Sequence, residues 1–175
     1  RVVVGFAVVA YLGLSAFMLR GFVRDFESDG TLYGAVIERD PAAAHGYGYL
    51  GMSLVNIQQP EASLEYLETA ISLRPEEEKY RISLAQALID LDRNQEAAAL
   101  LGKWAREARP ASAPMYLYRM SYALEDSDPA RAVDALLACL RINSAWGSCL
   151  DRLAELSRDE ALGPDCRAAL SRQLQ

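Results

Sequence analysis

Histidine and cysteine are scarce in this chain, which has one histidine and three cysteines among 175 residues. Structural zinc sites draw their ligands mainly from these two residue types, and a Ser-His-Asp set needs a histidine near its nucleophile. His45 lies between Ala44 and Gly46, and no two cysteines have the C-x-x-C spacing. The chain also lacks the G-x-x-x-x-G-K-[ST] phosphate loop and a dinucleotide fingerprint. The sequence therefore predicts no catalytic residues, no metal and no cofactor.

Basic residues are outnumbered, with 18 lysines and arginines against 24 aspartates and glutamates, a net charge of −6. Arg1, Arg20 and Arg24 stand in the first 24 residues, which contain no acid. Residues 25–175 therefore hold 15 basic and 24 acidic side chains, a net charge of −9. Nucleic-acid-binding domains need a basic face. This balance predicts that the chain has no nucleic-acid partner.

The three cysteines, Cys139, Cys149 and Cys166, all lie in the last quarter of the chain. Their odd number and late position favour buried free thiols, which behave as small apolar side chains. A disulfide between Cys139 and Cys149 is the alternative, because the repeat alignment below puts those two residues on adjacent helices.

A long stretch without charge opens the chain, the segment "VVVGFAVVAYLGLSAFML" from Val2 to Leu19. Its 18 residues would extend about 27 Å as a helix, close to the roughly 30 Å of a bilayer core. A signal peptide would need a shorter apolar region and an A-x-A-like site, which "SAFMLRGF" does not contain. A buried core helix is the other alternative, but apolarity all round the helix favours lipid. We expect residues 1–24 to be a transmembrane helix and flank that contacts the bilayer through residues 2–19.

Two features of the sequence point to opposite orientations of this span in the membrane. Because the chain begins at Arg1 and not at methionine, the segment is expected to be either a single span or the last span of a larger membrane protein. Arg20 and Arg24 would hold the following residues in the cytoplasm. A short N-terminal anchor commonly leaves its domain outside. We favour a bacterial inner membrane with the rest of the chain on the periplasmic side.

A period of about 34 residues runs through the remainder of the chain. Pro41 and Pro75 are 34 residues apart, and each closes a stretch with helical character. Under this shift the following pairs coincide: Leu50 with Leu84, Gly51 with Ala85, Leu54 with Leu88, and Leu67 with Leu101. A further shift of 35 brings Ala97 to Ala132, Leu101 to Leu136 and Trp104 to Cys139.

These positions resemble the tetratricopeptide repeat, a pair of antiparallel helices. The first full repeat has the residues Tyr47, Leu50, Gly51, Leu54, Ser63, Leu67, Ala70 and Pro75. In the second repeat, Arg81 and Trp104 depart from the family pattern. The third repeat is looser, with Leu117, Met120, Ser121 and Leu124 in the first-helix positions. The fourth is degenerate and is similar to a terminal cap.

The resemblance implies an all-α chain in which an N-terminal transmembrane helix is followed by an α-solenoid of helix hairpins. Residues 25–44 would form a linker and a half-repeat helix, and residues 45–175 about three repeats with a degenerate C-terminal cap. Gly51 is expected where the two helices of a hairpin approach closely. Gly46 and Gly48 have no explanation at this level. Pro60 and Pro129 are expected in first helical turns, the latter behind Asp128 as N-cap.

In the family that the chain resembles, the first helix of each repeat lines a concave groove. The corresponding residues here are Tyr49, Met52, Asn56, Lys79, Ser83, Gln86, Asp90, Tyr118 and Tyr122. These tyrosines and amides suit hydrogen bonding to an extended peptide or a docked helix. Of the basic clamp with which some members hold a C-terminal carboxylate, only Lys79 is present. The alternative is that the tyrosines only seal the seams between helices.

Three functions follow as hypotheses. The leading one is a membrane-anchored scaffold or adaptor that binds a protein partner within a membrane complex. The second is the C-terminal tail of a polytopic glycosyltransferase, because residues 18–54 resemble the junction in membrane O-mannosyltransferases that carry such repeats. The third is a structural accessory subunit of a larger membrane assembly.

Overall fold

A computed structural model describes residues 29–158, which contain eight α-helices and no strand. The helices are α2 (Asp29–Arg39), α3 (Ala44–Asn56), α4 (Pro60–Leu73), α5 (Glu78–Asp90), α6 (Asn94–Glu107), α7 (Ala113–Leu124), α8 (Pro129–Ile142) and α9 (Gly147–Leu156). The described part of the chain is therefore all-α, as the sequence predicts.

The helices recur at the period that the sequence contains. Helices α3, α5, α7 and α9 begin at residues 44, 78, 113 and 147, which gives spacings of 34, 35 and 34 residues. Helices α4, α6 and α8 begin at residues 60, 94 and 129, at spacings of 34 and 35. The period is thus a repeating pair of helices, with connections of only a few residues.

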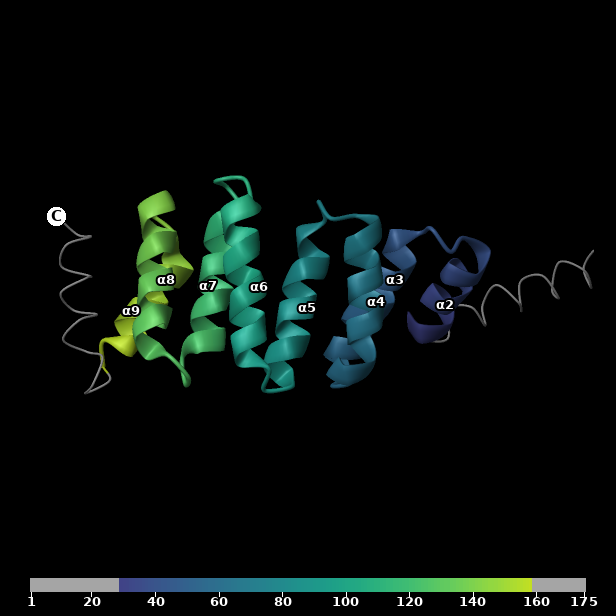
Figure 1. Ribbon diagram of the computed structural model, residues 1–175, viewed down its shortest axis with the longest axis horizontal. Coiled ribbons are helices and arrows are strands. Elements are labelled where there is room, and N and C mark those ends of the chain that lie inside the picture. The colour runs from purple at the N-terminus through teal and green to yellow at the C-terminus, as the bar shows by residue number, and fades with distance from the viewer. Residues whose placement is uncertain (1–28, 159–175) are drawn as a thin grey trace, which may run out of the picture. The chain divides into compact units, whose positions relative to one another are not determined.

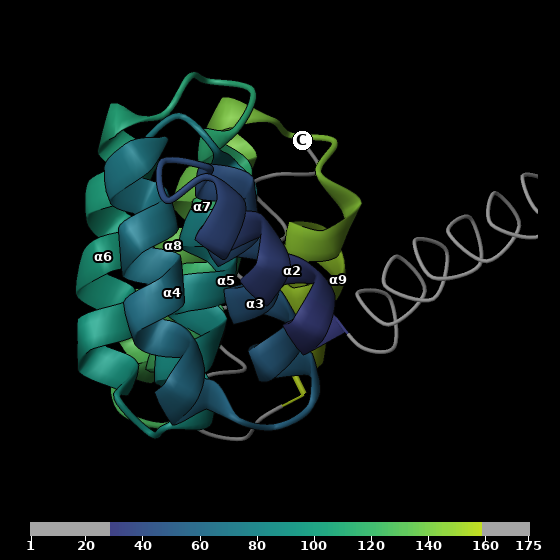
Figure 2. The same ribbon diagram turned by 90° about the vertical axis from the view of Figure 1, so that its right-hand side faces the viewer.

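The described residues fall into two compact units, divided within α5 between Tyr80 and Arg81. In the first unit, α3 packs against both α2 and α4. In the second, α7 packs between α6 and α8, and α8 also packs against α9. Helices α6, α7 and α8 stand side by side with their axes nearly aligned (Figure 1). Figure 2 shows α9 on the side of this unit away from α6.

The close approach expected at Gly51 is confirmed. A Cβ placed on Gly51 would lie 2.6 Å from Cγ of Leu67 and 3.2 Å from its backbone nitrogen. Leu67 on α4 is completely buried. The missing side chain lets the two helices of this hairpin meet, and the apolar burial that follows offsets the low helix propensity of glycine.

The turns and caps that the sequence encodes are also present. Pro60 and Pro129 occupy the first turns of α4 and α8, where a missing N–H costs nothing. Asp128 caps α8 by accepting a hydrogen bond from the backbone N–H of Arg131 at 3.2 Å. These features depend on local sequence alone, and each is confirmed.

The expectation of free thiols is wrong for two of the three cysteines. Cys139 on α8 and Cys149 on α9 are fully buried and form a disulfide. The repeat alignment correctly puts them on adjacent packed helices, which brings two side chains ten residues apart in sequence into bonding contact. They join a core cluster with Leu136, Leu140 and Leu153. Covalent linkage and apolar burial thus hold α9 onto α8.

Several predictions lie outside the described residues. These are the transmembrane helix and flank at residues 1–24, the start of the linker up to residue 28, Cys166, and the end of the predicted cap from residue 159 onward. Within residues 25–44, where the linker and half-repeat helix are predicted, the structure contains the helix α2. No helix in residues 29–158 is long and apolar enough to cross a membrane.

Candidate functional site

None of the nine predicted groove residues belongs to the buried core. Tyr49, Met52 and Asn56 lie on α3, Lys79, Ser83, Gln86 and Asp90 on α5, and Tyr118 and Tyr122 on α7. Tyr49 and Tyr122 expose 37% and 40% of their surface. Tyr49, Met52, Asn56 and Lys79 belong to the first unit and the other five to the second, and the contacts within each unit decide what these residues could bind.

In the first unit, Tyr49 lies between an aromatic ring and a cation. Its ring stacks on Tyr33 of α2, with the centroids 5.3 Å apart. Lys79 donates a hydrogen bond to the Tyr49 hydroxyl at 3.2 Å, and its ammonium lies 4.8 Å from the ring centroid. This hydrogen bond is the main cause that raises the pKa of Lys79. Tyr49 thus partly seals a seam between helices, although its outer edge stays exposed.

Met52 and Asn56 lie three and seven residues after Tyr49, on the same face of α3. Met52 is half-buried and Asn56 is exposed. This face of α3 therefore presents three groups to solvent, one after the other along the helix: the Tyr49 ring, the Met52 thioether and the Asn56 amide.

In the second unit, polar side chains of α5 and α7 form a hydrogen-bonded network. Arg119 donates from Nη1 to Oε1 of Gln86 at 3.1 Å. Gln86 in turn donates from Nε2 to Oδ1 of Asp90 at 2.8 Å. On α7, the hydroxyls of Tyr118 and Tyr122 are 3.0 Å apart, and their rings meet edge to face with the centroids 5.2 Å apart. These contacts join the side chains in two sets, Arg119–Gln86–Asp90 and Tyr118–Tyr122.

Four of these residues line a pocket of about 360 Å³. Its lining consists of Gln86, Ile89, Tyr118, Arg119 and Tyr122. The hydrogen bond to Tyr122 and partial burial raise the pKa of Tyr118, so the Tyr118 hydroxyl is a neutral donor and acceptor near neutral pH. The pocket therefore offers one guanidinium, one amide and two hydroxyls around an isoleucine.

Arg152 on α9 supports the pocket from one side. Its guanidinium lies 4.4 Å from the ring centroid of Tyr122 and forms ion pairs with Glu125 and with Glu155, the latter at 2.7 Å. Burial works against its charged form, yet the hydrogen bonds to both carboxylates hold the pKa of Arg152 above its ordinary value. Glu125 is thus tied into an ion pair with Arg152.

Two residues of the pocket lining, Ile89 and Arg119, are absent from the predicted groove residues. Tyr49, Ser83 and Arg119 occupy one position of the repeat, at spacings of 34 and 36 residues. Gln86 and Tyr122 share the next inward position at the same spacing of 36. A strict use of this register would have named Arg119. Ser83 is half-buried on α5 and does not line the pocket.

Within residues 29–158, no three side chains of His, Cys, Asp or Glu gather as metal ligands would. His45 is exposed on α3. The α5–α7 pocket, with hydrogen bonds among its lining side chains, is therefore the candidate site.

No family model matches this chain, and neither does any curated protein.

Proposed function

We propose that this chain is a membrane-anchored scaffold of tetratricopeptide type that holds a protein partner through the α5–α7 pocket. The partner segment is an extended peptide whose main chain and side chains bond to the groove. The observation that carries this proposal is the convergence of Gln86, Tyr118, Arg119 and Tyr122 on one exposed pocket.

The helix pairs support the family assignment. They recur every 34 or 35 residues, and the small residue Gly51 meets Leu67 where the repeat pattern requires a close crossing. Ala85 is the equivalent small residue of the second repeat and is buried. Repeats of this kind generate extended binding surfaces from their first helices.

The chemistry of the pocket favours a peptide. The Gln86 amide and the tyrosine hydroxyls can both donate to carbonyls and accept from N–H groups, which an extended main chain presents in alternation. Arg119 adds a planar, charged donor for a carbonyl or a carboxylate of the peptide. Tyrosine and arginine are also the residue types that contribute most at protein interfaces.

Two features support the location. The uncharged segment at residues 2–19 has the length and composition of a membrane span. The Cys139–Cys149 disulfide favours an oxidising compartment, because such bonds are rare in the cytosol of most organisms. We therefore place the repeats on the periplasmic side of a bacterial inner membrane.

Photo-crosslinking in native membranes tests this proposal. A benzophenone amino acid is introduced at Tyr122 or Gln86 of the full chain, and at the exposed Glu68 of α4 as a control. The two pocket positions should give the same dominant protein adduct, and Arg119→Ala should weaken it. An adduct pattern shared with Glu68, or unaffected by Arg119→Ala, would contradict binding in the pocket.

A further inference from the structure

A second hollow in the same unit lies on the opposite side of α7. It is a groove of about 610 Å³ between α6 and α8, with α7 as its floor. Its floor residues Leu117 and Met120 lie roughly 150° around the helix from Tyr118 and Tyr122. A ligand in this groove would therefore not compete with one in the α5–α7 pocket.

The groove exists because small side chains line its walls. Gly102 and Ala105 face it from α6, and Ala135 and Ala138 face it from α8. A Cβ on Gly102 would meet no atom closer than 3.5 Å, so packing does not require glycine there. The space is left open between the helices, and Leu117 and Met120 remain half-buried at its base.

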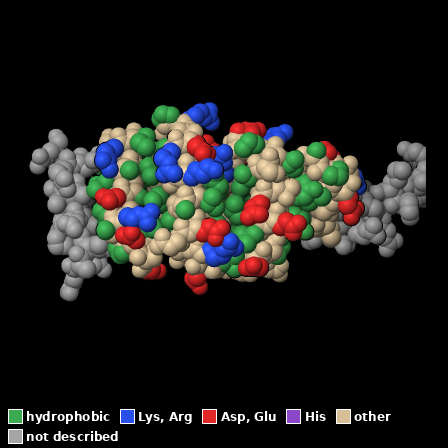
Figure 3. Space-filling model, viewed as in Figure 1, with side chains coloured by type: hydrophobic (Ala, Val, Ile, Leu, Met, Phe, Trp, Pro, Cys, Tyr) green, Lys and Arg blue, Asp and Glu red, His purple; other side chains and the backbone are tan. Residues whose placement is uncertain are grey.

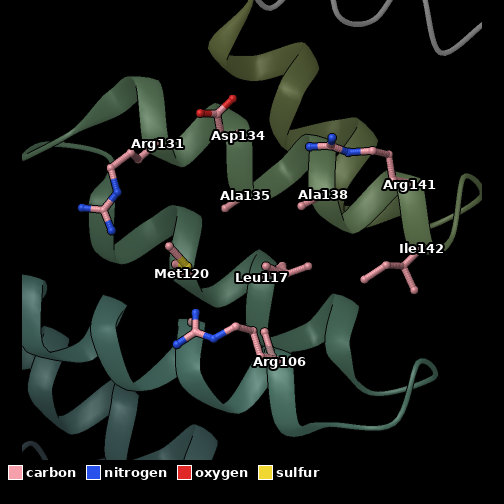
Figure 4. A pocket seen from close by; sticks show the side chains of 11 residues that line it. Arg106, Leu117, Met120, Arg131, Asp134, Ala135, Ala138, Arg141 and Ile142 are labelled. Carbon is pink, nitrogen blue, oxygen red and sulfur yellow. The ribbon is translucent and has the colours of Figure 1, made fainter.

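Arginines surround this apolar groove. Arg106 reaches in from α6, and Arg131 and Arg141 stand at the two ends of the α8 wall (Figure 4). Figure 3 shows basic side chains gathered over α6, α7 and α8 with hydrophobic ones between them. Asp134 is the one acidic residue of the lining, so the rim carries a net charge of +2. This contrasts with the net charge of −9 of residues 25–175.

The arginines are poorly neutralised by the chain itself. Within residues 29–158, neither Arg106 nor Arg141 forms an ion pair with a carboxylate. Arg141 only donates to the Leu137 carbonyl at 3.4 Å. Arg131 forms an ion pair with the half-buried Asp128 at 3.6 Å. The rim therefore holds guanidinium groups that an external carboxylate can bind in bidentate fashion.

From this arrangement we infer a second docking site, which takes an acidic amphipathic helix of a partner protein. Apolar side chains on one face of that helix would fill the space above Leu117 and Met120, and Ile142, 45% exposed, would extend this contact at one end. Glutamates or aspartates on its flanks would bind the arginines on both walls. With two sites on opposite sides of α7, the chain can hold two partner segments at once.

Fluorescence anisotropy on the purified full chain tests this inference. The probe is a labelled synthetic helix with leucines along one face and glutamates on both flanks, and its control has lysine in place of every glutamate. The acidic helix should bind and the basic one should not. The affinity should fall about tenfold in Arg106→Ser/Arg141→Ser, and further at high salt.

Three variants locate the binding. Ala138→Leu fills the groove and should abolish binding while circular dichroism stays unchanged. Arg109→Ser removes an exposed arginine outside the groove and should have no effect. Arg119→Ala should also leave the affinity unchanged, which separates this site from the α5–α7 pocket.

Three other results of these experiments would overturn the inference that the groove binds an acidic helix. Equal binding of the acidic and basic helices would mean that the groove does not select charge. Self-association of the chain that Arg106→Ser/Arg141→Ser abolishes, without binding of the acidic helix, would identify a second copy as the occupant. Arginine-dependent binding of anionic lipid vesicles, again without binding of the helix, would identify a lipid headgroup.

Discussion

The ring of Tyr80 lies directly against the backbone of Gly48. A Cβ on Gly48 would overlap three ring carbons of Tyr80, the farthest of them at 2.6 Å. Tyr80 is only 2% exposed and cannot swing aside. Gly48→Ala should therefore destabilise the chain by about 1–3 kcal/mol through overpacking, although alanine is the better helix former by about 1 kcal/mol. Urea unfolding measures the change.

The matched control is Gly34→Ala on α2. A Cβ there would meet no atom within 4 Å. The propensity gain should then appear alone, as a stabilisation of up to about 1 kcal/mol. If both variants were stabilised equally, the ring contact at Gly48 would be refuted.

Gln58 is expected to be a site of backbone strain. It adopts a positive φ of 60° in the turn between α3 and α4, where the N–H of Gln59 bonds to the Leu54 carbonyl at 2.9 Å. Glycine adopts this conformation without a Cβ penalty, so Gln58→Gly should stabilise the chain by roughly 1 kcal/mol. The exposed helical residue Glu65 is the control, since Glu65→Gly should cost about 1 kcal/mol. A loss of stability in both variants would contradict the left-handed conformation at Gln58.

Reduction of the disulfide should lower stability. The bond between Cys139 and Cys149 closes a short loop with a sequence separation of 10, for which loop-closure entropy predicts about 2–3 kcal/mol. Urea unfolding with and without dithiothreitol should differ by this amount. In Cys139→Ala/Cys149→Ala the reductant should have no effect, whereas Cys166→Ala should keep the wild-type response. A wild-type chain insensitive to reductant would show that the bond does not form.

Stability should fall at alkaline pH through Tyr118. The hydrogen bond to Tyr122 and burial raise the pKa of Tyr118 in the folded chain. Its contribution is complete below the ordinary tyrosine value near pH 10 and is lost as the pH rises through the raised folded value. Unfolding free energies measured from pH 9 to 11 should decline less steeply in Tyr118→Phe.

Two other groups of the first unit titrate in the same direction. Burial raises the pKa of Tyr80, and the hydrogen bond to Tyr49 raises that of Lys79. A residual alkaline decline should therefore persist in Tyr118→Phe. Tyr122→Phe removes the hydrogen-bond partner and should flatten the same part of the curve. An unchanged slope in Tyr118→Phe would rule out its role.

The departures from the repeat pattern show how much depends on tertiary contacts. Arg81 and Trp104 stand at positions where the pattern predicts other residues. In the structure the Arg81 guanidinium lies 5.7 Å from the Trp104 ring centroid, so the two departures pack on each other. Neither departure can be explained from the sequence alone, because the residue on which it packs lies on another helix.

The candidate site was predicted only in part for a similar reason. Gln86, Tyr118 and Tyr122 follow from the position of each residue within its repeat. Arg119 was not predicted, although it stands at the same 36-residue spacing from Ser83 as Tyr122 does from Gln86. What gives Arg119 its role is the hydrogen bond to Gln86, 33 residues away on another helix.

The sequence alone determined the helical class, the period, the N-cap at Asp128 and the small residue at Gly51, since all of these are set by spacing and local backbone preference. Only the tertiary structure decided that Cys139 and Cys149 are bonded, that Gly48 makes room for Tyr80, and that arginines rim a groove over α7. Those features depend on which side chains of separate helices meet, and a linear pattern does not specify such distances.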